Sequence, residues 1–184
     1  MADEAARDRL FELIRTRSFR QGEAFQLASG RTSTIYFDMK RILFEPEAIA
    51  LVAELVLDKL RPEPVDLIGG MAVGAVPLVA AVSQKSWPER PLPGFFVRKT
   101  VKDHGTQNTI EGLPPEALKD QTVVMLEDVS TTGGSVMLAV RAARGAGASV
   151  NKVLTLVDRQ EGAAANLAAE GLTLLSLYRA DEFV

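Results

Sequence analysis

Five short apolar segments, each ending at a glycine or a charged residue, alternate with helical segments over the last two thirds of the chain. The predicted strands are 65–69, 95–98, 123–127, 153–158 and 172–177. Helices are predicted at about 76–83 and 135–144, and in an alanine-rich stretch that ends at Glu170. Strands and helices that alternate in this way form a parallel sheet with helices on both faces. The sequence therefore predicts an α/β fold with a central parallel five-stranded sheet.

The N-terminal part of the chain has a different pattern. Apolar residues in 4–17 are spaced for one face of a helix, and 25–40 contains a Ser-Gly turn between apolar segments, as in a hairpin. Pro46, at a first helical position, opens a helix that is predicted to run to about Leu60. With 184 residues, the chain is expected to form a single domain, 1–184.

The polar and glycine-rich clusters of the sequence follow the predicted strands. They are 69–74, 98–99, 127–135 and 158–159. In an open α/β sheet, ligands bind beyond the carboxyl ends of the strands, and these ends meet at one edge. We therefore expect one composite site.

The stretch VVMLEDVSTTGGS, 123–135, has the composition of a ribose-phosphate site. Two carboxylates, Glu127 and Asp128, end an apolar strand and suit the two vicinal hydroxyls of a ribose, or a Mg²⁺ ion. The segment 130–135 supplies hydroxyls, glycines and a helix N-terminus, all of which favour a phosphate. The alternative is a plain helix entry in which the acids and hydroxyls are caps.

Three cations and the only histidine lie within seven residues after the second predicted strand. They are Arg98, Lys99, Lys102 and His104. A charge run is usually a solvated loop. Because this one follows a strand end that should face the ligand, we expect the cations to bind a diphosphate and to stabilise it as it leaves.

Two further segments carry weaker signals. Arg159, at another strand end, offers a planar fork for a carboxylate, but a surface ion pair with Asp158 or Glu161 explains it equally well. The segment 29–38 reads by itself as a turn and a core strand.

Taken in order, these motifs resemble those of a known family. The 123–135 stretch resembles the phosphoribosyl-diphosphate-binding signature of type I phosphoribosyltransferases, although its first acid is Glu127 rather than Asp. The pattern RKxxKDHG at 98–105 resembles the catalytic loop of orotate phosphoribosyltransferases, and DRxEG at 158–162 resembles their carboxylate-binding segment. The resemblance implies a type I phosphoribosyltransferase fold in which about 1–40 contribute a hood subdomain.

The resemblance also implies residue roles. The residues expected to bind phosphoribosyl diphosphate are Arg98, Lys99, Lys102, His104, Glu127, Asp128, Val129, Ser130, Thr131, Thr132, Gly133, Gly134 and Ser135. Those expected to bind orotate are Tyr36, Phe37, Thr131 and Arg159, and those expected to be catalytic are Lys102 and Asp128. Mg²⁺ is expected to bind with the substrate near the two acids. A homodimer is expected in which the 98–108 loop acts in the neighbouring subunit's site.

The sequence departs from the family pattern at two places, and two other functions stay open as alternatives. Some relatives have lysine at the position of Ala28 and a Tyr-Lys pair where this chain has Val73 and Gly74, which puts lysine contacts there in doubt. A phosphoribosyltransferase for another base would not need the fork of Arg159. A nucleotide-sensing regulator would not need a cationic loop, because it has no leaving group to stabilise.

Composition removes several other classes of protein. The chain has no cysteine and one histidine, which excludes disulfides, thiolate catalysis and zinc sites built from cysteine or histidine. The net charge of −3 gives no indication of a nucleic-acid or membrane partner. The N-terminus is not a signal peptide, and no apolar run has the ~20 residues of a membrane span, so a cytoplasmic protein is expected.

Overall fold

The computed structural model of the chain describes residues 4–26, 32–99 and 109–184. Within these residues the strands are β1 (Phe19–Gln26), β2 (Thr32–Phe37), β3 (Leu67–Met71), β4 (Gly94–Val97), β5 (Ile110–Glu111), β6 (Thr122–Ser130), β7 (Ser149–Asp158) and β8 (Thr173–Arg179). The α-helices are α1 (Glu4–Leu13), α2 (Lys40–Leu43), α3 (Pro46–Leu60), α4 (Ala75–Ser86), α5 (Gly134–Gly145) and α6 (Ala163–Ala169). A π-helical turn (Ile14–Ser18) follows α1, and 3-10 turns lie at Pro115–Leu118 and Ala180–Glu182.

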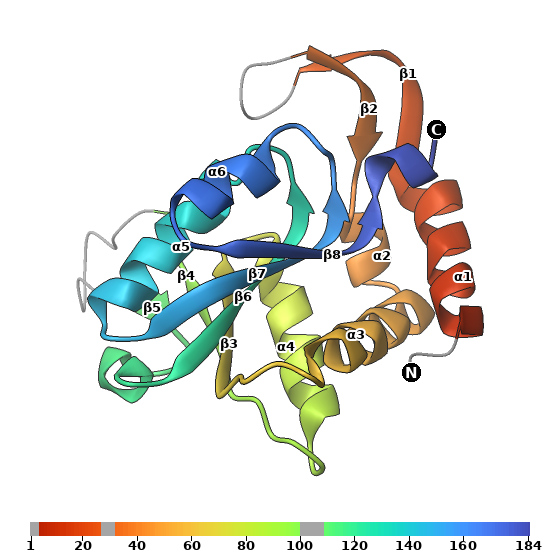
Figure 1. The fold of residues 1–184 in the computed structure, drawn as a ribbon. Helices are drawn as coiled ribbons and strands as arrows, with labels where there is room; N and C mark the ends of the chain where they lie inside the picture. Colours follow the sequence, from red (N-terminus) through yellow and green to blue (C-terminus); the bar gives the residue numbers. More distant parts are fainter. Residues whose placement is uncertain (1–3, 27–31, 100–108) are drawn as a thin grey trace.

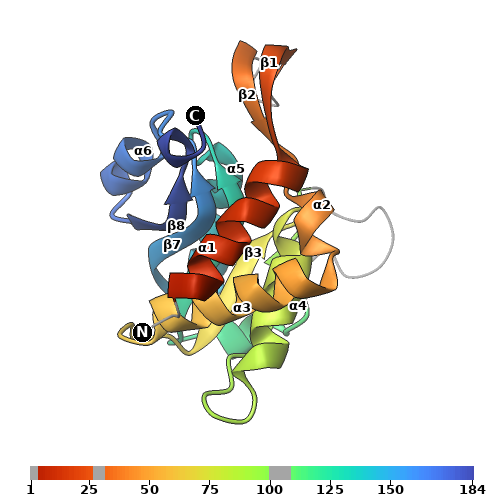
Figure 2. The same cartoon turned by 90° about the vertical axis from the view of Figure 1, so that its right-hand side faces the viewer.

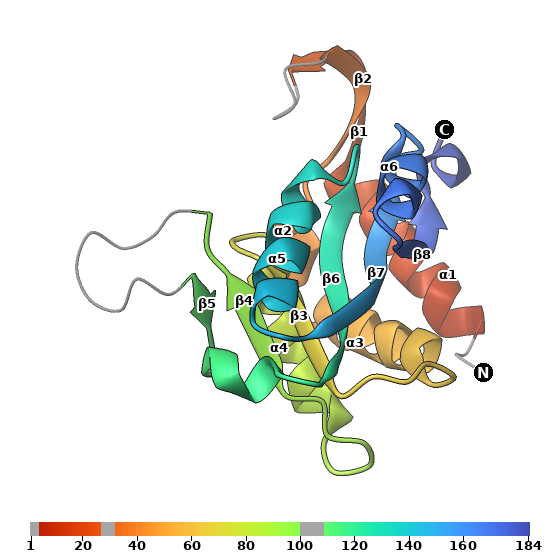
Figure 3. The same ribbon diagram turned by 60° about the vertical axis from the view of Figure 1, so that its left-hand side comes forward.

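The described strands form two sheets. β1 and β2 pair as an antiparallel hairpin that projects from the body of the molecule (Figure 1). The main sheet has the order β5-β4-β3-β6-β7-β8. Its last five strands are parallel, which confirms the predicted parallel sheet, but β5 pairs antiparallel with β4 at the edge and was not predicted (Figure 3).

Helices cover both faces of the main sheet, as predicted. α1, α3 and α4 lie on one face, and α5 and α6 on the other (Figure 2). Alternate residues of β6 point to opposite sides, so that Val124 and Leu126 join the core under α3 and α4, whereas Val123 and Met125 join the core under α5. Residues 123–126 are fully buried and point alternately to the two faces, which is why this part of β6 is apolar without interruption.

The strand order determines where a ligand can bind. The connection after β3 leads to β4 on one side, whereas the connection after β6 leads to β7 on the opposite side, so the winding direction reverses between β3 and β6. At such a switch point, the loops after the two strands diverge and leave a crevice at the carboxyl edge of the sheet. The loops after Met71 and after Ser130 are therefore the expected walls of a site.

No helix among the described residues is long and apolar enough to span a membrane.

Candidate active site

A cavity of about 520 Å³ lies at this switch point. It is lined by Tyr36, Phe37, Met71, Ala72, Lys99, Glu127, Asp128, Val129, Thr131, Thr132, Gly133, Gly134, Ser135, Leu138 and Arg159. Residues far apart in the sequence, from β2, from the end of β6 and from the loop after β7, thus share one cavity. The composite site expected from the strand ends is present.

Of the two acids near the end of β6, Glu127 is buried and Asp128 is half-buried. Glu127 is 7% exposed, and its carboxylate accepts a hydrogen bond from the buried hydroxyl of Ser130. Burial raises the pKa of the Glu127 carboxyl to about 7, against the lowering effect of the Ser130 hydroxyl. Burial likewise raises the pKa of Asp128, although the backbone N–H of Val129 donates to Oδ1 at 2.9 Å. A ligand that brings hydroxyls or a cation would stabilise both ionised forms.

The glycine at position 74 gives the Asp128 carboxylate its space. A Cβ atom on Gly74 would lie 2.9 Å from each Asp128 carboxylate oxygen. A larger residue at this position would therefore require a different placement of Asp128. The other departure, Ala28, lies outside the described residues.

The buried charge of Glu127 predicts an unusual dependence of stability on pH. The pKa is near 4.5 when the group is unfolded and about 7 when it is folded, so the folded protein loses stability as pH rises through this window. Glu127→Gln removes the charge and keeps an acceptor for Ser130. We expect this variant to be more stable than the wild type at pH 8, by up to about 3 kcal/mol, with a much smaller difference at pH 5.

Thermal melting of the ligand-free protein at both pH values measures this effect. Glu170→Gln is a matched control, because Glu170 is an exposed glutamate that pairs with Arg141 at 3.3 Å. A gain for Glu127→Gln that is equal at the two pH values would contradict the burial of a titrating charge.

The turn after β6 presents backbone donors to the cavity. The carbonyls of Ser130, Thr131 and Thr132 accept hydrogen bonds in sequence from the Arg159 N–H (2.9 Å), the Ala163 N–H (3.1 Å) and the Asn166 side chain (2.9 Å). A peptide C=O and the N–H that follows it point in opposite directions. The N–H groups of residues 131–133 therefore point away from the 159–166 segment, and all three residues line the cavity.

The first turn of α5 continues this wall of the cavity. Gly133 adopts a left-handed conformation (φ 79°) directly before the helix, where a Cβ atom would lie 3.2 Å from Leu167. Gly134 and Ser135 then begin a helix whose N-terminal end lines the cavity. Converging N–H groups and a helix N-terminus together favour an anion.

Of the cationic residues predicted to bind the diphosphate, only some can be placed in the cavity. Lys99 lines the cavity. Arg98 does not; its guanidinium lies 3.6 Å from Glu111 of β5, and its backbone N–H donates to Thr109. Lys102 and His104 lie outside the described residues, so their roles stay predictions.

One side of the cavity is formed by Arg159 and by residues of the β1–β2 hairpin. The side chain of Arg159 is 2% exposed and forms an ion pair with Glu161 at 2.6 Å. Tyr36 and Phe37 both line the cavity. The ring of Phe37 also packs at 5.0 Å from that of Phe19 and 5.2 Å from that of Phe183, so this residue serves the core as well as the cavity wall.

Some functional positions differ from the prediction. Ser130 is fully buried and turns its hydroxyl to Glu127, so it does not line the cavity. Met71 and Ala72, from the 69–74 cluster expected at the site, do line it. Leu138 of α5 also lines it and was not predicted, because an apolar residue in a helix gives no signal apart from core packing. Lys40 was also missed; it pairs with Asp38 at 2.9 Å, and its charge lowers the pKa of Asp128 against the effect of burial.

The chain by itself offers few metal ligands. No group of three or more acidic or histidine side chains in the described part of the chain is placed to hold a metal ion. A buried and a half-buried carboxylate side by side nonetheless suit Mg²⁺, which takes most of its ligands from phosphate oxygens and water. The donor set therefore fits a metal that arrives with its substrate.

Comparison with known proteins agrees with this geometry. Residues 38–172 match the model of the phosphoribosyl transferase domain. An orotate phosphoribosyltransferase of Bradyrhizobium diazoefficiens is 50% identical over 100% of this chain and 99% of its own. Orotate phosphoribosyltransferase from Mycobacterium tuberculosis, in complex with Fe(III) dicitrate, superimposes with a TM-score of 0.82 at 36% identity, covering 97% of this chain and 98% of the other. A structure of that enzyme with 5-phospho-α-D-ribosyl 1-diphosphate gives a TM-score of 0.79 at 34% identity, with the same coverage.

The fold, the acid pair with its phosphate turn, and the family match define a phosphoribosyltransferase. The full-length similarity is to enzymes that use one particular base. The chain belongs to the orotate phosphoribosyltransferases.

Proposed function

We infer that the chain transfers the phosphoribosyl group of phosphoribosyl diphosphate to orotate, which gives orotidine 5′-monophosphate and diphosphate. The observation that carries this conclusion is the single cavity that holds the acid pair, the phosphate turn and Arg159. The first two features suit a phosphorylated ribose, and the arginine suits a base that bears a carboxylate.

On the donor side, the chain positions a ribose between hydrogen-bond donors and carboxylates. The N–H groups of the turn and of the start of α5 bind the 5′-phosphate. Asp128, beside Glu127, accepts hydrogen bonds from the ribose hydroxyls. As the bond from C1 to the diphosphate breaks, positive charge grows on C1 and negative charge on the leaving group. Lys99 lines the cavity from an exposed position and supports the diphosphate, because a cation placed beside the leaving group stabilises its growing negative charge.

Mg²⁺ is proposed to accompany the diphosphate. Asp128 and Glu127 are the residues that would hold it, directly or through the ribose hydroxyls. When bound, the ion neutralises the oxygens of the leaving diphosphate.

On the acceptor side, Arg159 is proposed to bind the orotate carboxylate, while Tyr36 flanks the ring. The ring nitrogen of orotate then forms its bond to C1 as the bond to the diphosphate breaks, and it gives up its proton, which an oxygen of the departing diphosphate can accept. Phe37 is held by the core, and so it can contribute a fixed wall but little adjustment.

The activity is tested with the purified chain, phosphoribosyl diphosphate and Mg²⁺. Orotate is expected to be consumed, whereas adenine, which has no carboxylate for Arg159, is expected to stay unreacted. Consumption of adenine instead of orotate would assign the chain to another base, and consumption of neither would support a binding protein.

We also propose a homodimer in which the 98–108 loop of one subunit serves the site of the other. Lys99, near the start of the loop, lines the cavity of its own subunit, so the contribution to the neighbouring site is proposed for the residues that follow it. The family resemblance supports this arrangement, and residues 100–108 lie outside the described part of the chain. A cytoplasmic location likewise stays a prediction.

The shared site predicts complementation between two inactive variants. Lys102→Ala is expected to lower turnover by at least ~100-fold, as for the loss of one charge-stabilising donor, and Asp128→Ala should be inactive as well. Random mixed dimers should recover about a quarter of wild-type activity, because about half of the dimers are mixed and each has one intact site. Steady-state assays on co-refolded subunits measure the recovery. No recovery in verified mixed dimers would place both residues in the same subunit's site.

A further inference from the structure

One guanidinium nitrogen of Arg159 contacts both a carboxylate and a backbone carbonyl. Its Nη2 atom lies 2.6 Å from Oε1 of Glu161 and donates to the backbone carbonyl of Ile35 at 3.1 Å. The carbonyl belongs to β2, so the arginine joins the hairpin to the loop after β7. The Glu161 side chain is 25% exposed, whereas that of Arg159 is 2% exposed.

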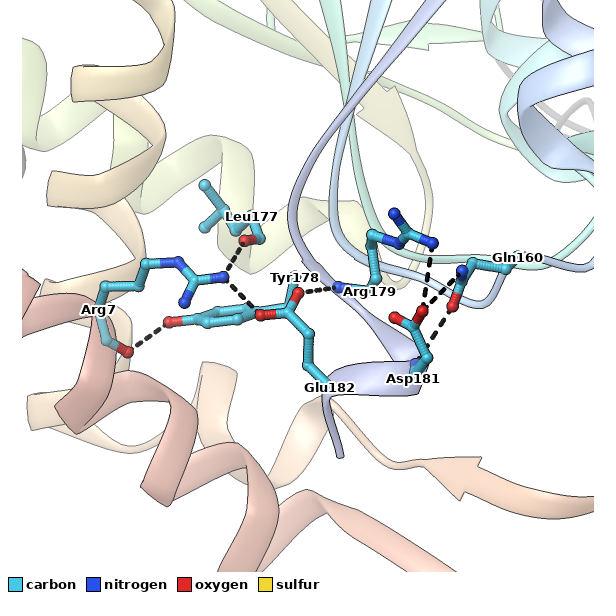
Figure 4. A network of polar contacts seen from close by, with 7 residues as sticks. All are labelled: Arg7, Gln160, Leu177, Tyr178, Arg179, Asp181 and Glu182. Atoms are coloured by element: carbon cyan, nitrogen blue, oxygen red, sulfur yellow. Dashed lines mark hydrogen bonds and ion pairs between the residues drawn. The ribbon is translucent and has the colours of Figure 1, made fainter. Parts of the chain in front are cut away.

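The chain is turned so that Arg159 and Glu161 meet. Gln160 between them adopts a left-handed conformation (φ 58°), which is uncommon for a residue other than glycine. Its backbone N–H donates to Asp158 at 2.8 Å, and its side-chain amide exchanges two 3.2 Å hydrogen bonds with Asp181 of the C-terminal turn (Figure 4). The sharp turn is thus fixed from both sides.

The same C-terminal turn is anchored at its other end to α1. Glu182 accepts a hydrogen bond from Arg7 at 2.7 Å, and the hydroxyl of Tyr178 donates to the carbonyl of Arg7 at 2.7 Å (Figure 4). The loop that carries Arg159 is therefore tied to the body of the molecule and not only to its own strand. A guanidinium on this support can keep one orientation in the absence of substrate.

We propose that Glu161 is a positioning residue that sets the orientation of the Arg159 guanidinium for the carboxylate of the acceptor base. The proposal rests on the proposed function, because it takes Arg159 as the residue that binds the carboxylate. A buried guanidinium needs a partner when the site is empty, and Glu161 supplies one. Because the guanidinium is planar, fixing Nη2 between Glu161 and Ile35 also fixes the plane in which the other nitrogens meet a ligand.

This role is specific to one substrate. Glu161 contacts Arg159 and is not among the residues that line the cavity. Its loss should change the binding of orotate and leave that of phosphoribosyl diphosphate as it was. Loss of a residue that only supports the structure would change the KM values of both substrates or lower the melting temperature.

The test compares Glu161→Ala, Glu161→Gln, Arg159→Ala and the double variant with the wild type. Glu161→Ala is expected to raise the KM for orotate about tenfold, with the KM for phosphoribosyl diphosphate within about twofold. Glu161→Gln keeps an oxygen that accepts from Nη2 and should restore most of the affinity. Glu170→Ala, which breaks the exposed pair with Arg141, is the control and should leave both KM values unchanged.

The double variant decides whether Glu161 acts through Arg159. We expect Arg159→Ala to raise the KM for orotate at least about 100-fold, and Glu161→Ala to add nothing in that background. Additive effects, or an unchanged KM for orotate in Glu161→Ala, would overturn the proposal. A lower KM in Glu161→Ala would also overturn it, because Glu161 would then compete with the substrate carboxylate.

The design separates this proposal from the proposed function. If the wild type does not use orotate, the proposed function fails before any variant is compared. If the wild type uses orotate but Arg159→Ala leaves its KM unchanged, the role of Arg159 fails. If only the Glu161 variants behave like the wild type, the positioning role alone is wrong.

Discussion

Asp128→Asn is expected to lower the turnover of orotate by about 100- to 1000-fold. The substitution preserves the size of the side chain but removes its charge and replaces one acceptor oxygen by a donor. In the cavity, Asp128 faces the position proposed for the ribose hydroxyls and for the positive charge that develops on C1. The amide N–H₂ would face one ribose hydroxyl as a second donor. The neutral side chain would stabilise neither the positive charge on C1 nor Mg²⁺.

Steady-state turnover at saturating substrates measures the effect. Asp120→Asn is the matched control, because Asp120 is exposed and adopts a left-handed conformation (φ 61°) that asparagine tolerates. The control should retain wild-type turnover. An Asp128→Asn variant within about threefold of the wild type would remove Asp128 from the catalytic site.

Gly70→Ala is expected to destabilise the protein by about 3 kcal/mol, which corresponds to a fall of roughly 10 °C in melting temperature. Gly70 lies in β3 where the strand passes α4 and β6. A Cβ atom there would lie 2.4 Å from the Cβ of Ala75 and 2.8 Å from the carbonyl oxygen of Leu126. Neither atom is at the end of a flexible side chain, so the strand or the helix must shift.

Calorimetric or spectroscopic melting checks this expectation. Gly145→Ala is the control, because no atom lies within 4 Å of a Cβ built on this last residue of α5. It should leave the melting temperature unchanged or raise it slightly. A Gly70→Ala protein that melts with the wild type would show that the close packing of β3 is not required.

Elements with local signals could be predicted from the sequence almost to the residue. α3 runs from Pro46 to Leu60, as expected, because Pro46 suits a first helical position and the Glu45 side chain accepts from the Ala48 N–H at 2.7 Å. The end of β6 was placed too early, at Glu127. It extends to Ser130 because Val129 and Ser130 pair with β7, and such pairing leaves no trace in the strand's own sequence.

In the candidate site, too, some features could be predicted from the sequence and others could not. Its acids, its turn and Arg159 could be predicted because each is a chemically unusual group at a strand end. The contact of Arg98 with Glu111 could not, because the two-residue strand β5 is too short to leave a pattern. The packing of Phe183 against Phe37 also brings together distant parts of the chain, and no periodicity relates the two rings.

The three carbonyls after β6 have a consequence for ligand design. Since Ser130, Thr131 and Thr132 direct their carbonyl oxygens to partners in 159–166, this wall of the cavity offers its ligand N–H donors and few backbone acceptors. A compound that replaces the phosphate with an amine or an ammonium group would set donor against donor there. Inhibitors aimed at this wall should carry an acceptor-rich, anionic group such as a phosphonate or a sulfonate, and cationic analogues of similar size should be rejected.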